Sequence, residues 1–297
     1  MNRYHTSVLL QETITALNIQ SGKKYIDGTL GGGGHTFEVL KRGGKVLGID
    51  VDDDALAFVE QKVKSQTSNV KIGENLFLVK NNFKDIDRIA REKGFASVAG
   101  ILLDLGVSSH HFDTPERGFS FQYEAPLDMR MDRTLQVQAG DLVNALTKSE
   151  LIELFTKLGE ERFTKSIVSV IVEARKTKRI ETTKELVEIV RKAVPFVKKG
   201  INPATQVFQA LRIAVNDELN SLIETLPKAV ALLESGGRLA IISFHSLEDR
   251  IVKRSFLEFE EKGWGTIITK KPIVPTEEEL QINSRSRSSK LRVFEKK

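Results

Sequence analysis

Short apolar runs alternate with amphipathic segments through the first hundred residues of this 297-residue chain. Four apolar runs have the length and composition of strands, at residues 25–27, 46–50, 76–79 and 101–104. The segments between them, residues 37–41, 55–64 and 86–93, carry apolar side chains at helical spacing and charges on the opposite face. Strands joined by crossover helices form a parallel sheet, so this pattern predicts a doubly wound α/β fold.

The alternation stops after Asp104. A polar stretch with many Gly and Pro residues, 106–133, is followed by helical segments with no strand between them. Two of these segments begin with the spacing of a capping box, Thr147 with Glu150 and Thr182 with Glu185. The second is expected to end at Pro195, because proline cannot continue a helix.

The α/β pattern returns towards the end of the chain. A long amphipathic stretch, residues 205–233, leads through two glycines into an apolar strand at 238–243. Residues 266–269 and 291–294 predict a closing antiparallel pair. The sequence therefore predicts a discontinuous core of residues 1–105 and 204–297, and a helical domain of residues 106–203 inserted after the fourth strand.

A glycine-rich loop follows the first predicted strand. It runs from Asp27 to His35 and opens a helix, and the next strand ends about twenty residues later at Asp50. An acidic side chain at that position can accept hydrogen bonds from the hydroxyls of an adenosine ribose. Thr36 stands where a nicotinamide-binding loop needs its last glycine. The loop instead resembles that of S-adenosylmethionine-dependent methyltransferases.

Composition limits the chemistry. The chain has no cysteine, which excludes disulfides, thiolate metal sites and cysteine nucleophiles. Its five histidines show no paired metal spacing, so we expect no metal. No apolar run is long enough to span a bilayer and no signal-peptide core is present, so we expect a soluble cytoplasmic protein with no membrane partner. A formal net charge of +5 favours a polyanionic partner.

Ten short sequence motifs, which occur in the same order as in a known protein family, carry a closer resemblance. They lie at residues 4–10, 26–29, 102–109, 117–121, 126–132, 159–163, 202–205, 208–213, 242–250 and 285–289. Together they resemble the bacterial small-subunit ribosomal RNA cytosine-N4 methyltransferase family almost from end to end. The resemblance implies a class I, Rossmann-like S-adenosylmethionine-dependent methyltransferase fold with a helical insertion.

The resemblance also implies a set of contacts with S-adenosylmethionine. Carried over residue by residue, they fall on Gly33, Gly34, His35, Asp50, Phe83, Asp104 and His111. The implied partner is 16S rRNA, within a small ribosomal subunit or a late assembly particle. The sequence leaves open whether naked rRNA is a substrate and whether the protein forms a homodimer.

The reaction implied is methyl transfer to the exocyclic N4 of a cytidine in the decoding region of 16S rRNA. Methylation at carbon 5 of a pyrimidine ordinarily needs a cysteine, which this chain lacks. Two alternatives remain: a dinucleotide-dependent oxidoreductase, disfavoured by Thr36, and a non-catalytic ribosome assembly factor that retains the cofactor fold. No general base can be assigned from the sequence.

Two further groups are candidates for RNA or substrate contacts. Phe244 and His245, after the last central strand, could supply a stacking face or a hydrogen-bond acceptor for the base, or serve as core and capping groups. Basic side chains near the end of the chain could track a sugar-phosphate backbone; they are Arg285, Arg287, Lys290 and Arg292. The basic runs 175–179 and 198–199 are more typical of solvated helix ends.

Overall fold

The structure is a computed structural model that describes residues 7–66, 69–194 and 202–297. The chain divides into two compact units, one formed by Met1–Gly106 with Leu219–Lys297 and the other by Val107–Glu218. The predicted end of a helix at Pro195, and the basic pair at 198–199, lie outside the described residues. Within the described ranges, no helix is both long enough and apolar enough to cross a bilayer.

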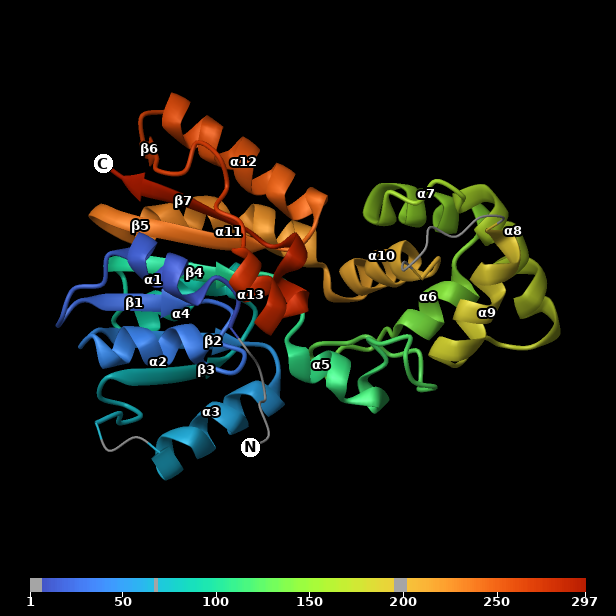
Figure 1. The fold of residues 1–297 in the computed structure, drawn as a ribbon, viewed down its shortest axis with the longest axis horizontal. Helices are drawn as coiled ribbons and strands as arrows, with labels where there is room; N and C mark the ends of the chain where they lie inside the picture. Colours follow the sequence, from blue (N-terminus) through green and yellow to red (C-terminus); the bar gives the residue numbers. More distant parts are fainter. Residues whose placement is uncertain (1–6, 67–68, 195–201) are drawn as a thin grey trace. The chain divides into compact units, whose positions relative to one another are not determined.

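The first unit is built on a seven-stranded sheet in the order β3-β2-β1-β4-β5-β7-β6 (Figure 1). The strands are β1 (Lys24–Asp27), β2 (Lys45–Asp50), β3 (Leu76–Lys80), β4 (Val98–Asp104), β5 (Leu233–Ser243), β6 (Gly265–Ile267) and β7 (Lys290–Lys296). Strands β1 to β5 pair in parallel, and β7 pairs antiparallel with both β5 and β6. The α/β sheet and its closing antiparallel pair confirm the predicted fold class.

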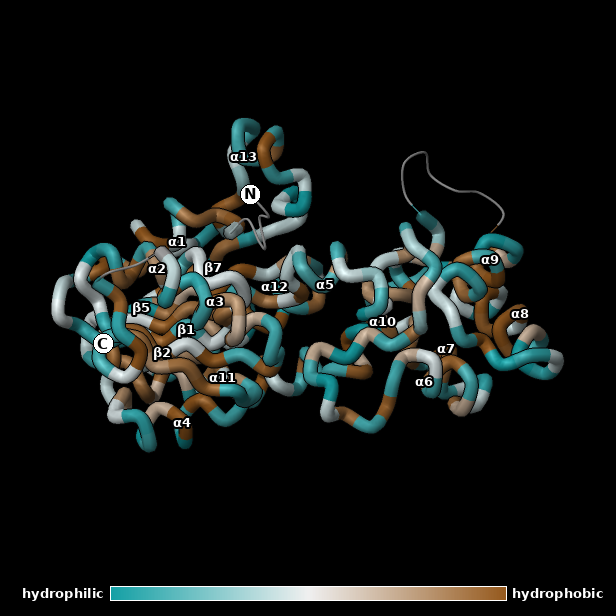
Figure 2. Tube along the Cα trace, turned by 90° about the horizontal axis from the view of Figure 1, so that it is seen from below, coloured by the Kyte–Doolittle hydropathy of each residue, from teal (hydrophilic) through white to brown (hydrophobic). Residues whose placement is uncertain are grey.

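Helices cover both faces of this sheet. The helices of the unit are α1 (Leu10–Leu17), α2 (Gly34–Lys41), α3 (Asp53–Gln66), α4 (Ile86–Glu92), α11 (Glu218–Leu232), α12 (Ser246–Glu261) and α13 (Glu277–Ile282). One apolar cluster joins the strands to α4, α11 and α12, and a second joins them to α2 and α3. The hydropathy trace in Figure 2 shows hydrophobic segments running through the sheet and hydrophilic segments in the connections.

The second unit is helical. It contains α5 (Ser109–Asp113), α6 (Ala139–Ala145), α7 (Lys148–Gly159), α8 (Thr164–Thr177), α9 (Thr183–Ala193) and α10 (Thr205–Asn216). Its own core gathers fully buried side chains such as Phe155 on α7, Ile167 on α8 and Leu211 on α10. The unit therefore buries an apolar interior independently of the sheet.

The predicted amphipathic stretch 205–233 forms two helices, α10 and α11, and its last residue, Leu233, begins β5. Asp217 adopts a left-handed conformation (φ 50°, ψ 41°) and caps α10, so α11 starts anew at Glu218. Arg212 and Glu218 form a bidentate ion pair across this break, with both N–O distances 2.9 Å. Helix α10, which the sequence analysis assigned to the core, lies in the second unit because it packs against α7.

Both predicted capping boxes are present. At the start of α9, the Thr182 hydroxyl accepts the Glu185 backbone N–H at 3.2 Å, and the Glu185 carboxylate accepts the Thr182 N–H at 3.1 Å. Thr147 and Glu150 repeat the pattern at α7. Hydrogen bonds, first that from Lys178, lower the pKa of Glu185 to about 2.

Replacing the α9 cap should destabilise the second unit. We expect Thr182→Ala to lower the free energy of unfolding by about 1 kcal/mol, because an N-terminal N–H loses its partner. Urea denaturation followed by circular dichroism measures the change. Thr177→Ala is the matched control, since Thr177 is an exposed threonine at the C-terminal end of α8, and it should be close to neutral. Equal losses of stability in the two variants would contradict the capping role.

Candidate functional site

The reversal of strand order beside β1 determines where the site can form. Strand β1 lies between β2 and β4 and pairs in parallel with both, and the helix after β1 and the chain after β4 leave the sheet at the same edge. Open α/β sheets bind ligands outside the carboxyl ends of their strands at such a point. Asp27, Asp50 and Asp104 are the last residues of β1, β2 and β4. Three carboxyl groups therefore end three neighbouring strands at one edge.

The glycine loop connects β1 to α2 at this edge. Gly33 caps α2 with φ +71°, a conformation that side-chain-bearing residues rarely adopt. Gly34 lies against Ser7, whose Oγ would be 1.9 Å from a Cβ added at that position. Backbone conformation therefore explains the glycine at the predicted contact Gly33, and close approach explains that at Gly34.

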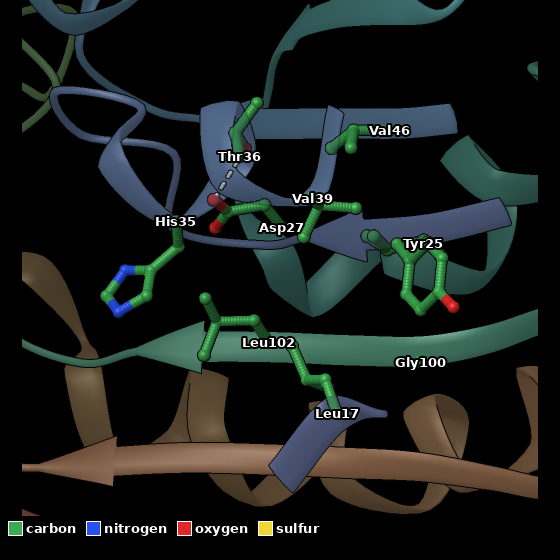
Figure 3. A pocket seen from close by; sticks show the side chains of 10 residues that line it. Leu17, Tyr25, Asp27, His35, Thr36, Val39, Val46, Gly100 and Leu102 are labelled. Carbon is green, nitrogen blue, oxygen red and sulfur yellow. Dashed lines mark hydrogen bonds between the residues drawn. The ribbon is translucent and has the colours of Figure 1, made fainter. Parts of the chain in front are cut away.

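Asp27 anchors the loop from inside the protein. Its Oδ2 accepts the Thr36 hydroxyl at 2.7 Å (Figure 3), and its Oδ1 accepts the Thr29 N–H at 3.3 Å. Burial raises the pKa of Asp27 to about 6, against the lowering effect of these hydrogen bonds. A small cavity lies beside this carboxyl, between it, His35 and the apolar side chains of Leu17 and Leu102. Asp27 therefore faces inwards and stabilises the loop.

Asp50 holds the loop from the neighbouring strand. Its Oδ2 accepts the Gly31 N–H at 2.8 Å and its Oδ1 accepts the Asp52 N–H at 2.9 Å. Burial raises its pKa to about 6. An ionised carboxylate offers about four lone-pair sites, so two backbone hydrogen bonds leave acceptor capacity for a ligand.

Asp104 differs from the other two carboxyl groups in its partners. Its backbone N–H donates to the Thr29 hydroxyl at 2.6 Å, and its Oδ2 lies 3.8 Å from His35 Nδ1. Its Oδ1 is buried and has no hydrogen-bond partner among the described residues. Burial, followed by the charges of Asp27, Glu248 and Glu279, raises the pKa of Asp104 well above the usual value. A buried acceptor of this kind suits a cationic ligand group.

Phe83 lies beside the start of the loop. It opens the 3₁₀ turn Phe83–Asp85, and its side chain packs against the main apolar cluster. A Cβ added at Gly28 would lie 3.4 Å from the Phe83 Cβ. The core unit thus brings together six of the predicted contact residues: Gly33, Gly34, His35, Asp50, Phe83 and Asp104.

His111 belongs to the second unit. It lies on α5, where its Nδ1 accepts the Ser108 N–H at 3.2 Å and its ring packs on Phe119 with centroids 4.8 Å apart. These contacts give His111 a structural role within its own unit. A direct contact with cofactor stays a prediction.

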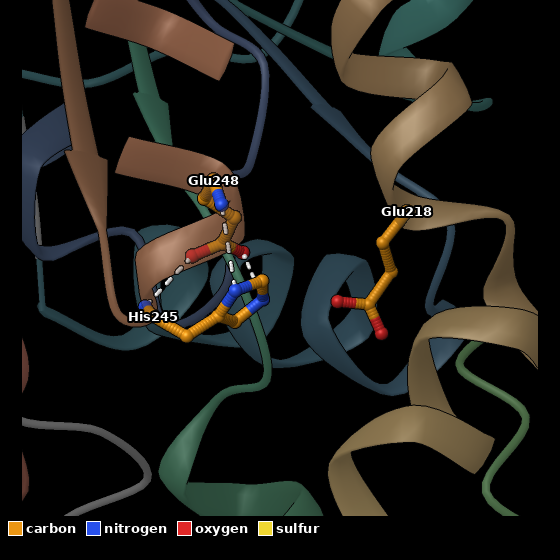
Figure 4. A group of neighbouring side chains, drawn as sticks. All are labelled: Glu218, His245 and Glu248. Carbon is orange, nitrogen blue, oxygen red and sulfur yellow. Dashed lines mark hydrogen bonds and ion pairs between the residues drawn. The ribbon is translucent and has the colours of Figure 1, made fainter. Parts of the chain in front are cut away.

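Further side chains, not predicted from the sequence, support the site. Thr29 and Thr36 supply hydroxyls to Asp104 and Asp27, and Thr36 had served only as evidence against a nicotinamide loop. Glu248, almost fully buried, accepts the Phe244 N–H at 2.8 Å and the His245 N–H at 3.2 Å. Figure 4 shows the pairing of His245 with Glu248. The signal for Glu248 was present as a capping-box spacing, since His245 Nδ1 accepts the Glu248 N–H at 3.4 Å.

Part of the predicted basic tail has a different role. Arg292, on β7, is buried and its Nε donates to Asp249 Oδ1 at 2.7 Å, and Lys290 pairs with the other oxygen at 3.1 Å. The prediction that Arg292 tracks a nucleic-acid backbone is therefore corrected, because its buried side chain joins β7 to α12; Lys290 is partly exposed and its contact stays a prediction. Arg285 and Arg287 are exposed and remain candidates.

Comparison with known proteins decides the family. The family model described as "MraW methylase family" matches residues 2–297. The chain belongs to this methylase family. A ribosomal RNA small subunit methyltransferase H from Clostridium botulinum is 47% identical over 98% of this chain and 98% of its own length. A protein of the same name from Lachnospira eligens is 45% identical over 98% of this chain and 97% of its own.

Among solved structures, an rRNA methylase from Streptococcus thermophilus is similar over 98% of this chain and 97% of its own. The identity is 14% and the TM-score is 0.47.

Burial of Asp27 gives the methylase a pH-dependent stability, which the hydrogen bond from Thr36 reduces. Asp27 titrates at about 6 in the folded protein and near 3.8 when unfolded, so its contribution to stability is complete below about pH 4 and is lost as the pH rises through 6. The Thr36 hydroxyl stabilises the ionised form. We expect Thr36→Val to lower the free energy of unfolding by about 1–3 kcal/mol at pH 8 and by less at pH 5.

Chemical denaturation at the two pH values measures this difference. Thr36→Ser retains the hydroxyl and should restore most of the stability at pH 8. A Thr36→Val effect that is the same at both pH values would show that the lost interaction is not with the ionised carboxylate.

Proposed function

We propose that this methylase transfers a methyl group from S-adenosylmethionine to the exocyclic N4 of a cytidine in the decoding region of 16S rRNA. Family membership and relatives named ribosomal RNA small subunit methyltransferase support the activity and the RNA. The observation that carries the cofactor assignment is the buried Oδ1 of Asp104, which has no partner within the described residues. S-adenosylmethionine supplies two cationic groups, an ammonium and the sulfonium that carries the methyl group.

The residues of the core fit this cofactor. The glycine loop ends at the N-terminus of α2, and Asp50 retains lone pairs for the two ribose hydroxyls. Asp104 and His35 form one corner of the site, and Phe83 offers an apolar wall beside Gly28. We assign cofactor contacts to Gly33, Gly34, His35, Asp50, Phe83 and Asp104, and to His111 from the second unit.

The chemistry required of the protein is mainly alignment. The amine of cytosine is conjugated with its ring, so an acceptor on its N–H groups would help to localise the lone pair for in-line attack. The loop after β5 is held rigidly, because the Glu248 carboxylate bonds two successive N–H groups of it. Phe244 in this loop offers a surface for stacking on the base. His245 acts as a helix cap in this structure, and its participation in proton transfer stays a hypothesis.

The substrate and its surroundings follow from the same family. We propose that the methylase acts in the cytoplasm on 16S rRNA held in a small ribosomal subunit or a late assembly particle. The exposed Arg285 and Arg287, with their forked donors, suit contacts with the phosphates of that RNA.

Asp50 provides the direct test of the cofactor site. We expect Asp50→Ala to weaken S-adenosylmethionine binding by about 1–3 kcal/mol, because a charged acceptor for two hydroxyls is lost. Isothermal titration calorimetry measures the affinity, and circular dichroism verifies that the variant is folded. Asp53→Ala is the matched control, since Asp53 is exposed and pairs with Lys80. An unchanged affinity for S-adenosylmethionine in folded Asp50→Ala protein would contradict the assignment of Asp50 to the ribose of the cofactor.

The reaction itself is tested in cells. Nucleoside mass spectrometry of 16S rRNA should show N4-methylated cytidine in cells with the gene and none after its deletion. Wild-type protein should restore the modification and Asp104→Asn should restore much less, because the neutral amide cannot pair with a cation. If the modification persists in the deletion strain, another enzyme makes it. If Asp104→Asn rescues growth without methylation, an assembly role is favoured.

A further inference from the structure

Residues 7–9 form a strained segment beside the cofactor site. Leu9 is fully buried and adopts a left-handed conformation (φ 49°, ψ 38°), which is rare for a residue with a side chain. Such conformations persist only where surrounding contacts hold them. Val8 and Leu9 pack into an apolar cluster that includes Leu102 of β4 and Ile242 of β5.

This segment contacts the cofactor loop in two ways. The Val8 carbonyl accepts His35 Nε2 at 3.2 Å, and Ser7 lies against Gly34. His35 in turn faces Asp104, with Nδ1 3.8 Å from Oδ2. The position of the segment therefore fixes the orientation of the His35 ring at the corner that Asp104 completes.

A side chain from the other end of the chain adds a hydrogen bond to this packing. Glu279, on α13, accepts the Leu9 backbone N–H with its Oε1 at 2.9 Å, across 270 positions of sequence. Burial raises the pKa of Glu279, an effect that the hydrogen bond from Leu9 opposes. The N–H of Leu9 precedes the first helical turn of α1, where helices leave donors without intrahelical partners.

We propose that Glu279 is a positioning residue of the cofactor site, acting through the Leu9 N–H and the Val8 carbonyl to orient His35 beside Asp104. This inference rests on the proposed function for the identity of the ligand. The hydrogen bond to Leu9 carries the effect. The negative charge of Glu279, which adds to that around Asp104, is a separate contribution that the variants distinguish.

Four variants separate the hydrogen bond from the charge. Glu279→Ala removes both. Glu279→Gln retains an oxygen that can accept the Leu9 N–H but carries no charge, and Glu279→Asp retains the charge on a side chain one methylene shorter. Glu278→Ala is the matched control, since Glu278 is an exposed acidic neighbour in the same helical turn.

We expect Glu279→Ala and Glu279→Asp to raise the dissociation constant for S-adenosylmethionine about tenfold, the scale of one lost hydrogen bond. Their KM for the cofactor should rise while kcat at saturating cofactor stays close to the wild-type value. A loss of folded protein would lower kcat instead. Glu279→Gln and Glu278→Ala should remain within about twofold of the wild type on the same scale.

A second measurement needs no cofactor. The ¹⁵N resonance of His35 Nε2 in the ligand-free protein reports the hydrogen bond to Val8, and it should move in Glu279→Ala and Glu279→Asp but not in Glu279→Gln. An unchanged His35 signal in Glu279→Ala overturns the inference, whether or not the protein binds S-adenosylmethionine. Failure of the wild-type protein to bind S-adenosylmethionine would refute the proposed function and leave this measurement valid. Equal losses in the Gln and Ala variants also overturn it, because the charge would then be responsible.

Discussion

The site depends on the burial of three carboxyl groups beside the loop that joins β1 to α2. Asp27, Asp50 and Asp104 end adjacent strands, and parallel pairing places them at one edge of the sheet. A buried carboxylate needs donors, and here the loop supplies them through the Gly31 N–H and the Thr36 hydroxyl. The loop conformation and the positions of the carboxyl groups are therefore determined together.

Asp104 is the exception within this arrangement, and it explains how the site can favour a cation. The other two carboxyl groups are satisfied by the loop, whereas Asp104 Oδ1 has no donor in the described part of the chain. Its surroundings contain further negative charge from Asp27, Glu248 and Glu279. A ligand with ammonium and sulfonium groups would relieve this repulsion, so binding and ionisation of the site are coupled.

The helical unit follows directly after the strand that carries Asp104. The chain enters it at Val107 and returns to the core after Glu218. Its helices share an apolar core of their own, and Arg175 fixes the end of α6 by donating to the carbonyls of Val143 and Leu146 at 2.6 and 2.7 Å. Arg175 of the basic run 175–179 therefore contributes to the stability of that unit, whereas Lys178 and Arg179 are exposed and form surface ion pairs with Glu185 and Asp141.

Local sequence determined the strands, the capping boxes at Thr147 and Thr182, and the glycine loop with its acidic neighbours, because periodicity, caps and turns depend on residues close together in the chain. Only the tertiary structure decided which distant groups meet. Glu279 bonds Leu9, Arg292 pairs with Asp249, and α10 packs with the inserted helices. None of these contacts has a local signature, since each depends on how the sheet and helices bring together segments tens to hundreds of residues apart.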